Sequence, residues 1–244
     1  MTDSQTDPQT DPGDRRSVLA ANLRTVESRI GAACQDAGRD PADVSLVVVT
    51  KFFPESDVRL LADLGVRAVG ENRHQEASAK AAACADLGMT WHFIGSIQSN
   101  KAAAVAGYSD VVESVDRLKL VGALDRGAAE AGRTVECLIQ VSLDPPQATG
   151  RGGATPDDIA AIAEAVAGAT SLRLGGVMAV APLGEPPSPA FERLAVIAAA
   201  LRADHPEARA VSAGMSGDLE DAVRCGATHV RVGSAVLGPR PPIK

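Results

Sequence analysis

Eight short runs rich in β-branched residues recur along the chain from residue 45 onward, and alanine-rich segments with helical spacing follow most of them. Strands that alternate with helices imply a parallel sheet, because a crossover is needed to return the chain to the same end of the sheet. Eight such strands predict a closed (β/α)₈ barrel. The expected strands lie near residues 45–50, 67–70, 90–94, 109–113, 136–142, 173–179, 208–212 and 228–232.

An open, doubly wound sheet is the alternative arrangement of the same elements. The strand count favours the barrel, and no Gly-x-Gly-x-x-Gly motif for a dinucleotide follows the first strand. Aromatic residues make up only 2% of the chain, so small aliphatic side chains must fill the core. Strands rich in alanine and valine suit the lumen of such a barrel.

The barrel is expected to form a single domain over residues 15–244, preceded by an acidic tail. Residues 1–14 repeat Thr-Asp-Pro and have no apolar face, which predicts a disordered segment. Apolar residues then recur at helical spacing from Leu19 to Ala33. A long helix is therefore expected before the first strand, ending near Gly38.

Charge and composition argue against several classes of partner. The net charge is −7, and four aspartates of the tail account for more than half of it, so the body offers no positive surface for nucleic acid or an anionic membrane. No segment is long and apolar enough to span a membrane, and the polar N-terminus does not read as a signal peptide. Four widely spaced cysteines predict reduced thiols, no metal site and a cytoplasmic location. Without a long exposed apolar stripe, we expect a monomer.

Lys51 directly follows the most strand-like stretch of the chain, residues 47–50. Barrels place their chemistry at the carboxyl ends of the strands, where burial lowers the pKa of a lysine and lets its amine form a Schiff base with a carbonyl. A lysine that merely extends to solvent from a strand end is the alternative interpretation. Lys101 is the one rival, but it follows the third strand by a full loop and should begin a helix.

Two clusters of small residues follow the last two expected strands. Ser216 is expected to be the N-cap of a short helix that stops at Gly226, and Gly233-Ser234 offers further backbone N–H groups and a hydroxyl. Loops after strands 7 and 8 of such barrels often bind phosphate. Each cluster alone could reflect ordinary capping or turn chemistry, but the two together indicate an anion site.

A lysine that can form a Schiff base, facing a phosphate site, suits pyridoxal 5′-phosphate, which carries an aldehyde and a phosphate ester. Arg231 lies between the two in the expected barrel. An arginine beside the pyridine nitrogen would keep that nitrogen unprotonated, because two positive charges repel, and the cofactor would be a weak electron sink.

The chain resembles the pyridoxal phosphate homeostasis protein family, the small fold-type III proteins related to the alanine racemase barrel. The resemblance covers residues 18–238. It rests on five stretches: Thr50-Lys51, Gly70-Glu71-Asn72-Arg73, Trp91-His92-Phe93-Ile94-Gly95 with Gln98 and Asn100-Lys101, Gly214-Met215-Ser216-Gly217-Asp218-Leu219, and Arg231-Val232-Gly233.

The resemblance implies a single barrel that carries pyridoxal phosphate on Lys51, with Arg231 by the pyridine nitrogen and Asn72 near the ring. It also implies that Ser212, Ser216, Gly233 and Ser234 hold the phosphate, with Met215 in the same loop. Members are regarded as carriers or regulators of the cofactor that supply it to other enzymes, so no catalytic residue is expected.

The sequence departs from the family pattern at positions near the expected cofactor face. Ser96 and Glu113 stand where histidine is common, Ala213 replaces a usual methionine, and Leu237 replaces a usual phenylalanine. The first two changes remove imidazoles, which puts in doubt any transfer role that depends on them.

Two other functions stay open from the sequence. A racemase of this fold takes its second base from a tyrosine of a separate C-terminal β-domain, whereas the only tyrosine here, Tyr108, precedes the fourth strand. A class I aldolase, in which Lys51 would attack a sugar-phosphate carbonyl, is the weaker alternative.

Overall fold

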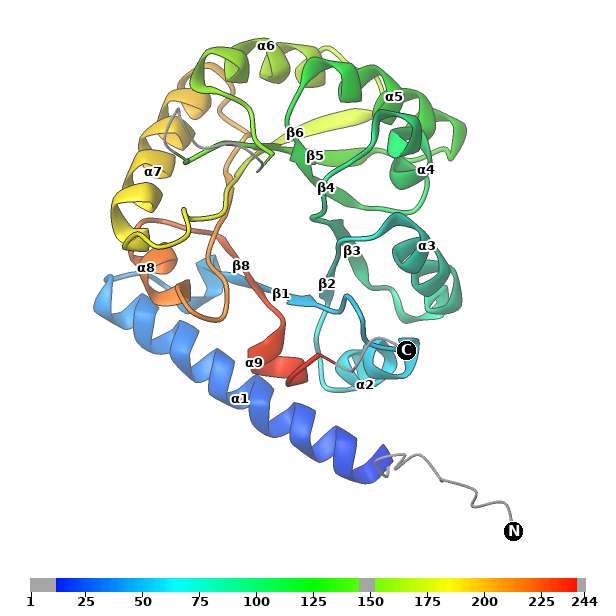
Figure 1. Cartoon of the computed structure of the whole chain (residues 1–244), viewed down its shortest axis with the longest axis vertical. Helices are drawn as coiled ribbons and strands as arrows, with labels where there is room; N and C mark the ends of the chain where they lie inside the picture. The colour runs from blue at the N-terminus through cyan, green and yellow to red at the C-terminus, as the bar shows by residue number, and fades with distance from the viewer. Residues whose placement is uncertain (1–11, 145–151, 241–244) are drawn as a thin grey trace.

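Eight parallel strands close into a barrel in the computed structural model, which describes residues 12–144 and 152–240 (Figure 1). The last strand pairs with the first, with Ser45 opposite His229, so the sheet has no free edge. The strands are β1 Ser45–Val49, β2 Ala68–Glu71, β3 Thr90–Phe93, β4 Val111–Val115, β5 Val135–Gln140, β6 Leu172–Met178, β7 Ala210–Ser212 and β8 His229–Val232.

Helices separate successive strands and form the outer layer around the barrel (Figure 1). The α-helices are α1 Pro12–Asp36, α2 Glu55–Asp63, α3 His74–Ala83, α4 Ala102–Ala106, α5 Leu118–Glu130, α6 Pro156–Ala167, α7 Pro187–Asp204, α8 Leu219–Arg224 and α9 Ser234–Leu237. Short 3-10 helices lie at η1 Pro41–Asp43, η2 Ala85–Leu87 and η3 Ser99–Lys101.

The predicted barrel is confirmed, and every expected strand is present within about two residues of its expected bounds. The predicted first helix is also confirmed, but α1 begins at Pro12, so residues 12–14 of the expected tail are helical. The rest of that tail, residues 1–11, lies outside the described residues.

Helix α1 lies diagonally across the outside of the barrel, next to α8 and α9 (Figure 1). One apolar face of α1 is buried through Leu19, Leu23, Val26 and Ile30, which recur at the spacing of an amphipathic helix. These side chains join the apolar cluster that covers the β8–β1 junction where the barrel closes. The N-terminal helix is therefore part of the barrel's own core.

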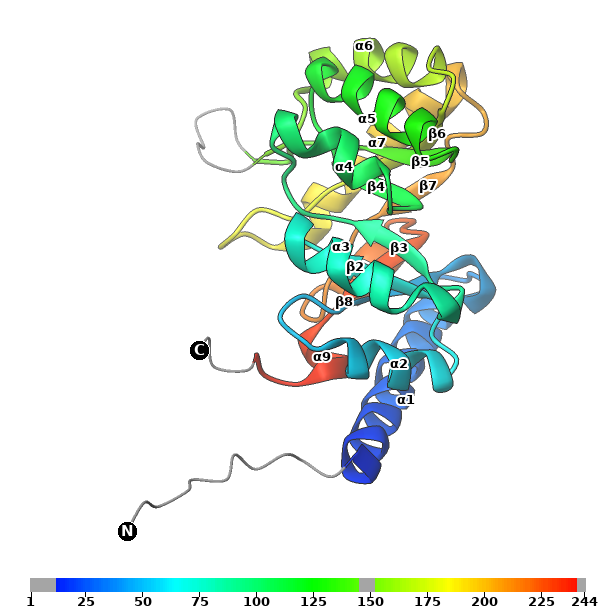
Figure 2. The same cartoon turned by 90° about the vertical axis from the view of Figure 1, so that its right-hand side faces the viewer.

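The loops that follow the strands all emerge on one side of the molecule, which lies to the left in Figure 2 and faces the viewer in Figure 1. Parallel strands bring all of their carboxyl ends to the same face, so residues far apart in the sequence meet there. Over residues 12–144 and 152–240, no helix is both long enough and apolar enough to cross a membrane.

Candidate functional site

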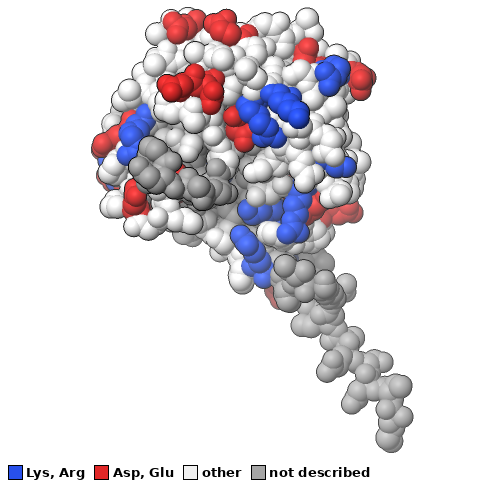
Figure 3. Space-filling model, turned by 45° about the horizontal axis from the view of Figure 1, so that its top comes forward, with Lys and Arg blue, Asp and Glu red and all other residues white. Residues whose placement is uncertain are grey.

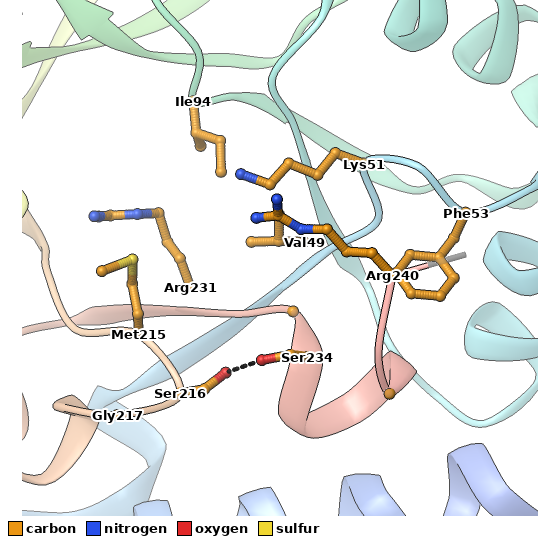
Figure 4. A pocket seen from close by; sticks show the side chains of 12 residues that line it. Val49, Lys51, Phe53, Ile94, Met215, Ser216, Gly217, Arg231, Ser234 and Arg240 are labelled. Atoms are coloured by element: carbon orange, nitrogen blue, oxygen red, sulfur yellow. Dashed lines mark hydrogen bonds between the residues drawn. The ribbon is translucent and has the colours of Figure 1, made fainter. Parts of the chain in front are cut away.

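A cavity of about 250 Å³ opens at the carboxyl ends of β1 and β8. Figure 4 shows side chains from β1, the loop after β7 and the end of β8 directed towards one space, with Lys51 and Arg231 on opposite sides of it. The lining residues are Val49, Lys51, Phe53, Ile94, Met215, Ser216, Gly217, Arg231, Gly233, Ser234, Gly238 and Arg240.

Lys51 is half-buried on the wall of this cavity, in the turn that follows β1. Burial lowers the pKa of its amine, and the positive charge of Arg240 lowers it further. A larger fraction of the amine is therefore uncharged near neutral pH than for an exposed lysine. An uncharged amine is the form that attacks a carbonyl.

The backbone next to Lys51 has an unusual conformation. Phe52 has φ of 72°, and among the described residues it is the only residue other than glycine with positive φ. Such a conformation costs of order 1 kcal/mol and persists where neighbouring groups hold it. Here the backbone N–H of Phe52 donates a 2.6 Å hydrogen bond to Oε1 of Glu76, which belongs to the first turn of α3.

Lys80 joins this support from inside the wall of the barrel. Its buried Nζ donates to the carbonyl oxygen of Thr50 at 2.8 Å and to Oε1 of both Glu71 and Glu76 at 2.7 Å. Thr50 in turn donates its hydroxyl to Oε1 of Glu71 at 2.6 Å. We call Thr50, Glu71, Glu76 and Lys80 the Lys80 clamp. It fixes the residues on both sides of Lys51 and so sets the direction of the amine.

Arg231 reaches the cavity from β8 but is itself only 4% exposed. Its guanidinium donates to the hydroxyl of Ser212 at 2.7 Å and to the carbonyl oxygen of Ala179 at 2.8 Å. Burial lowers the pKa of Arg231, but a guanidinium stays protonated in proteins. Arg231 is therefore a fixed positive charge that borders the cavity.

A buried carboxylate lies behind Arg231. Oε2 of Glu113 is 3.7 Å from the guanidinium and accepts a 2.6 Å hydrogen bond from Ser212, while Oε1 lies 2.7 Å from Nδ1 of His92. Burial would raise the pKa of Glu113, but the hydrogen bond and charge of His92 and the charge of Arg231 outweigh it and lower the pKa to about 2. The departure at Glu113 thus adds a counter-charge for Arg231 inside the barrel.

The end of the cavity opposite Lys51 has the features of an anion cradle. Within the described part of the chain, the backbone N–H groups of Ser216, Gly217, Gly233 and Ser234 donate no hydrogen bond. The hydroxyls of Ser216 and Ser234 lie 3.4 Å apart (Figure 4). Four uncommitted N–H groups and two hydroxyls in one place form a concave donor site of the kind that phosphate requires.

The prediction that Ser216 is a helix N-cap is wrong. Helix α8 begins at Leu219 with Asp218 as the residue before it, and Oδ1 of Asp218 accepts a 2.5 Å hydrogen bond from the N–H of Met215. That bond closes a turn over residues 215–218 and moves the helix start two residues along the chain. Ser216 therefore faces the cavity from a loop, with its N–H uncommitted.

Six of the eight predicted cofactor residues line the cavity together: Lys51, Met215, Ser216, Arg231, Gly233 and Ser234. The other two lie elsewhere. Ser212 is fully buried between Glu113 and Arg231, and Asn72 lines a neighbouring cavity. Ser212 thus contacts the buried network, and Asn72 lies next to Gly95, where the ends of β2 and β3 approach closely.

Sequence reasoning missed several residues that line or support the cavity. Ile94 and Arg240 line the cavity, and Glu76 and Lys80 support Lys51 from α3. The i,i+4 spacing of Glu76 and Lys80 is typical of an ion pair on a helix, but it does not indicate that the pair is buried. Nothing in the sequence brings Arg240 to Phe52, whose ring lies 5.0 Å from the Arg240 guanidinium carbon.

The residues present fit pyridoxal phosphate. The cavity combines an amine of lowered pKa, a fixed guanidinium and a cradle of uncommitted N–H donors, which match the aldehyde, the ring nitrogen and the phosphate of that molecule. Apolar side chains of Val49 and Ile94 lie between them, where the flat ring would pack.

Comparison with known proteins shows matches over most of the chain. The family model for the N-terminal domain of alanine racemase matches residues 19–241. The pyridoxal phosphate homeostasis protein of Mycobacterium tuberculosis is 44% identical over 93% of this chain and 95% of its own length. That of Escherichia coli is 35% identical over 91% of this chain and 97% of its own length.

Solved structures show the same fold. PipY of Synechococcus elongatus, determined with pyridoxal phosphate bound, is 34% identical with a TM-score of 0.79, over 90% of this chain and all of that one. Alanine racemase from Corynebacterium glutamicum is 18% identical with a TM-score of 0.67, and the match covers 94% of this chain but 63% of the racemase. At that identity the racemase shares the fold alone.

Proposed function

Because this chain belongs to the pyridoxal phosphate homeostasis protein family, we propose that it binds pyridoxal 5′-phosphate and acts as an intracellular carrier and buffer of that cofactor. One observation carries the proposal: a single cavity holds the half-buried amine of Lys51 and, across from it, the uncommitted N–H groups of the anion cradle. The bound pyridoxal phosphate of PipY supports the assignment.

Lys51 holds the cofactor in this proposal. Its uncharged amine is the form that would hold the cofactor, by adding to the aldehyde carbon with loss of one water. The phosphate would be bound by the backbone N–H groups of Ser216, Gly217, Gly233 and Ser234. Met215 and Ile94 would shield the ring from water. When bound, pyridoxal phosphate supplies an electrophilic carbonyl and an electron-withdrawing ring.

Arg231 limits what that ring can do. Its guanidinium is fixed by Ser212 and by the carbonyl oxygen of Ala179, and it would be a positive charge beside the pyridine nitrogen of a bound cofactor. A fixed positive charge disfavours a proton on that nitrogen. The ring then withdraws electrons weakly, which suits storage of the cofactor better than chemistry on an amino acid.

The racemase alternative lacks a second base. The only tyrosine of the chain, Tyr108, precedes β4, stacks on His74 and does not line the cavity of Lys51. Among the described residues lining the cavity, Lys51 is the only group that could remove a proton from an α-carbon near neutral pH. We therefore assign no catalytic residue.

We place this function in the cytoplasm, with apo-enzymes that need pyridoxal phosphate as recipients. The free state of all four cysteines, three of them buried, supports a reducing compartment. We propose a monomer, since one chain supplies every group of the cavity.

A transfer experiment tests the proposal. Protein loaded with pyridoxal phosphate and freed of excess cofactor is mixed with an apo-aminotransferase in the presence of alkaline phosphatase, which destroys free cofactor. Recovery of aminotransferase activity above that of an equal amount of free cofactor supports a carrier. Conversion of L-alanine to D-alanine, measured by circular dichroism and abolished in Lys51→Ala, would instead establish a racemase.

A further inference from the structure

A second cavity of about 440 Å³ lies at the same end of the barrel, between the start of α3 and the segment from β3 to η3. It shares no lining residue with the cavity of Lys51. Nothing in the proposed function uses it.

Two positive side chains line this cavity without a carboxylate to neutralise them. Over the described residues, Arg73 and Lys101 form no ion pair. The nearest acidic residues in the sequence, Glu71 and Glu76, are both bound to Lys80. Arg73 stacks on the ring of Phe52, with its guanidinium carbon 4.7 Å from the ring centroid. Stacking holds the guanidinium plane while its N–H donors stay available at the edge.

Several Lys and Arg side chains gather in the lower central part of the face drawn in Figure 3, with few acidic side chains among them. The whole protein carries a net charge of −7, so local positive charge of this kind runs against its overall composition. Unpaired cations in a concave site concentrate the field there and attract anions.

Backbone N–H groups at the start of α3 add hydrogen-bond donors to this cavity. Arg73 is the N-cap of α3, a helix of ten residues, and its side chain makes no capping bond, so the N–H groups of the first turn stay unsatisfied near His74 and Gln75. Nδ1 of His74, whose ring stacks on Tyr108, is buried and has no hydrogen-bond partner within the described residues. The open helix terminus fits a site whose ligand supplies the acceptors.

The floor of the cavity is apolar, formed by Phe93, Ile97 and Val105. From the two unpaired cations, the open helix terminus and this floor, we propose that the cavity binds a phosphate monoester with a small apolar body. A phosphate monoester carries close to two negative charges and three acceptor oxygens, which match Arg73, Lys101 and the N–H donors. A monocarboxylate would leave one cation unpaired.

Calorimetric titration of the full-length protein with phenyl phosphate tests this proposal. We expect one site outside the Lys51 cavity that is weakened at least about tenfold in Arg73→Gln and in Lys101→Gln, since each change removes a charge-assisted hydrogen bond. Lys119→Gln, on an exposed position of α5, is the matched control and should bind like the wild type.

Further titrations test whether this site is separate from the Lys51 cavity and which class of ligand it binds. The titration is repeated after pyridoxal phosphate has been tethered to Lys51 with borohydride; the site should persist. If pyridoxal phosphate does not become attached to Lys51, the proposed function is wrong. The comparison of Arg73→Gln and Lys101→Gln with the wild type still tests the second site. Three results would overturn the proposal of a phosphate monoester site. The site could disappear after tethering, or both variants could bind phenyl phosphate as tightly as the wild type. Benzoate could also bind as tightly as phenyl phosphate.

Discussion

The backbone N–H of Phe52 donates a hydrogen bond of 2.6 Å to Oε1 of Glu76, which lies 24 residues further along the chain. Through this bond the first turn of α3 holds the positive φ of the residue directly after Lys51. Lys80 binds the same oxygen of Glu76 and also the carbonyl of Thr50, on the other side of Lys51. The direction of the Lys51 amine therefore depends on side chains outside the cavity.

Substitution of Glu76 should disturb Lys51 without unfolding the barrel. In Glu76→Ala the N–H of Phe52 and the ammonium of Lys80 lose a shared acceptor, and a hydrogen bond to a charged group is worth roughly 1.5–3 kcal/mol. We expect the affinity for pyridoxal phosphate, followed by absorbance, to fall about tenfold or more. Glu76→Gln should recover part of it, because the amide oxygen can still accept from Phe52.

The partial rescue separates positioning from general destabilisation. Circular dichroism should show the same secondary structure in both variants, and Glu130→Gln, an exposed position on α5, should bind cofactor normally. Equal affinities of Glu76→Ala and the wild type would show that the clamp does not position Lys51.

Substitution of Arg240 should shift the pH dependence of cofactor binding. The charge of Arg240 is the second cause, after burial, of the lowered pKa of Lys51. Its removal in Arg240→Gln stabilises the protonated amine, so the pKa of Lys51 rises and less uncharged amine is present at neutral pH. The rate of Schiff base formation should fall at neutral pH, and its inflection should move to higher pH. Arg126→Gln, on the exposed surface of α5, should leave the profile unchanged.

Glu113 should contribute to stability in a pH-dependent way. Its pKa in the folded protein is about 2, below its ordinary value of 4.5, so its contribution is fully present above pH 4.5 and is lost as the pH falls from there towards 2. Glu113→Gln leaves Arg231 buried without its counter-charge, at a cost of about 3 kcal/mol at pH 7. Urea unfolding of the variant and wild type should show this difference at neutral pH and a smaller one near pH 3, whereas a constant difference would contradict the assignment.

The barrel could be predicted because hydrophobic periodicity reports directly on strands and helices. Eight strand-like runs alternate with helical segments, and eight parallel strands close without an edge. Lys51 and Arg231 could be placed at one face for the same reason, since parallel strands end together.

Side-chain direction at the strand ends was harder to predict. Ser212 ends β7 as expected, but its hydroxyl lies inside the barrel between Glu113 and Arg231. Residue order gave no sign of this contact, because Glu113 is 99 residues away in the chain. The Lys80 clamp was missed for a related reason: a lysine in a helical pattern looks exposed until the fold turns that face of α3 towards β1 and β2.

Borohydride reduction of the protein mixed with pyridoxal phosphate, followed by peptide mass mapping, tests directly whether Lys51 holds the cofactor. We expect an absorbance band shifted from that of free cofactor, a reduced adduct on Lys51, and loss of both in Lys51→Ala while the fold is kept. An adduct on Lys101 instead, or no adduct on a protein that is folded, would contradict it.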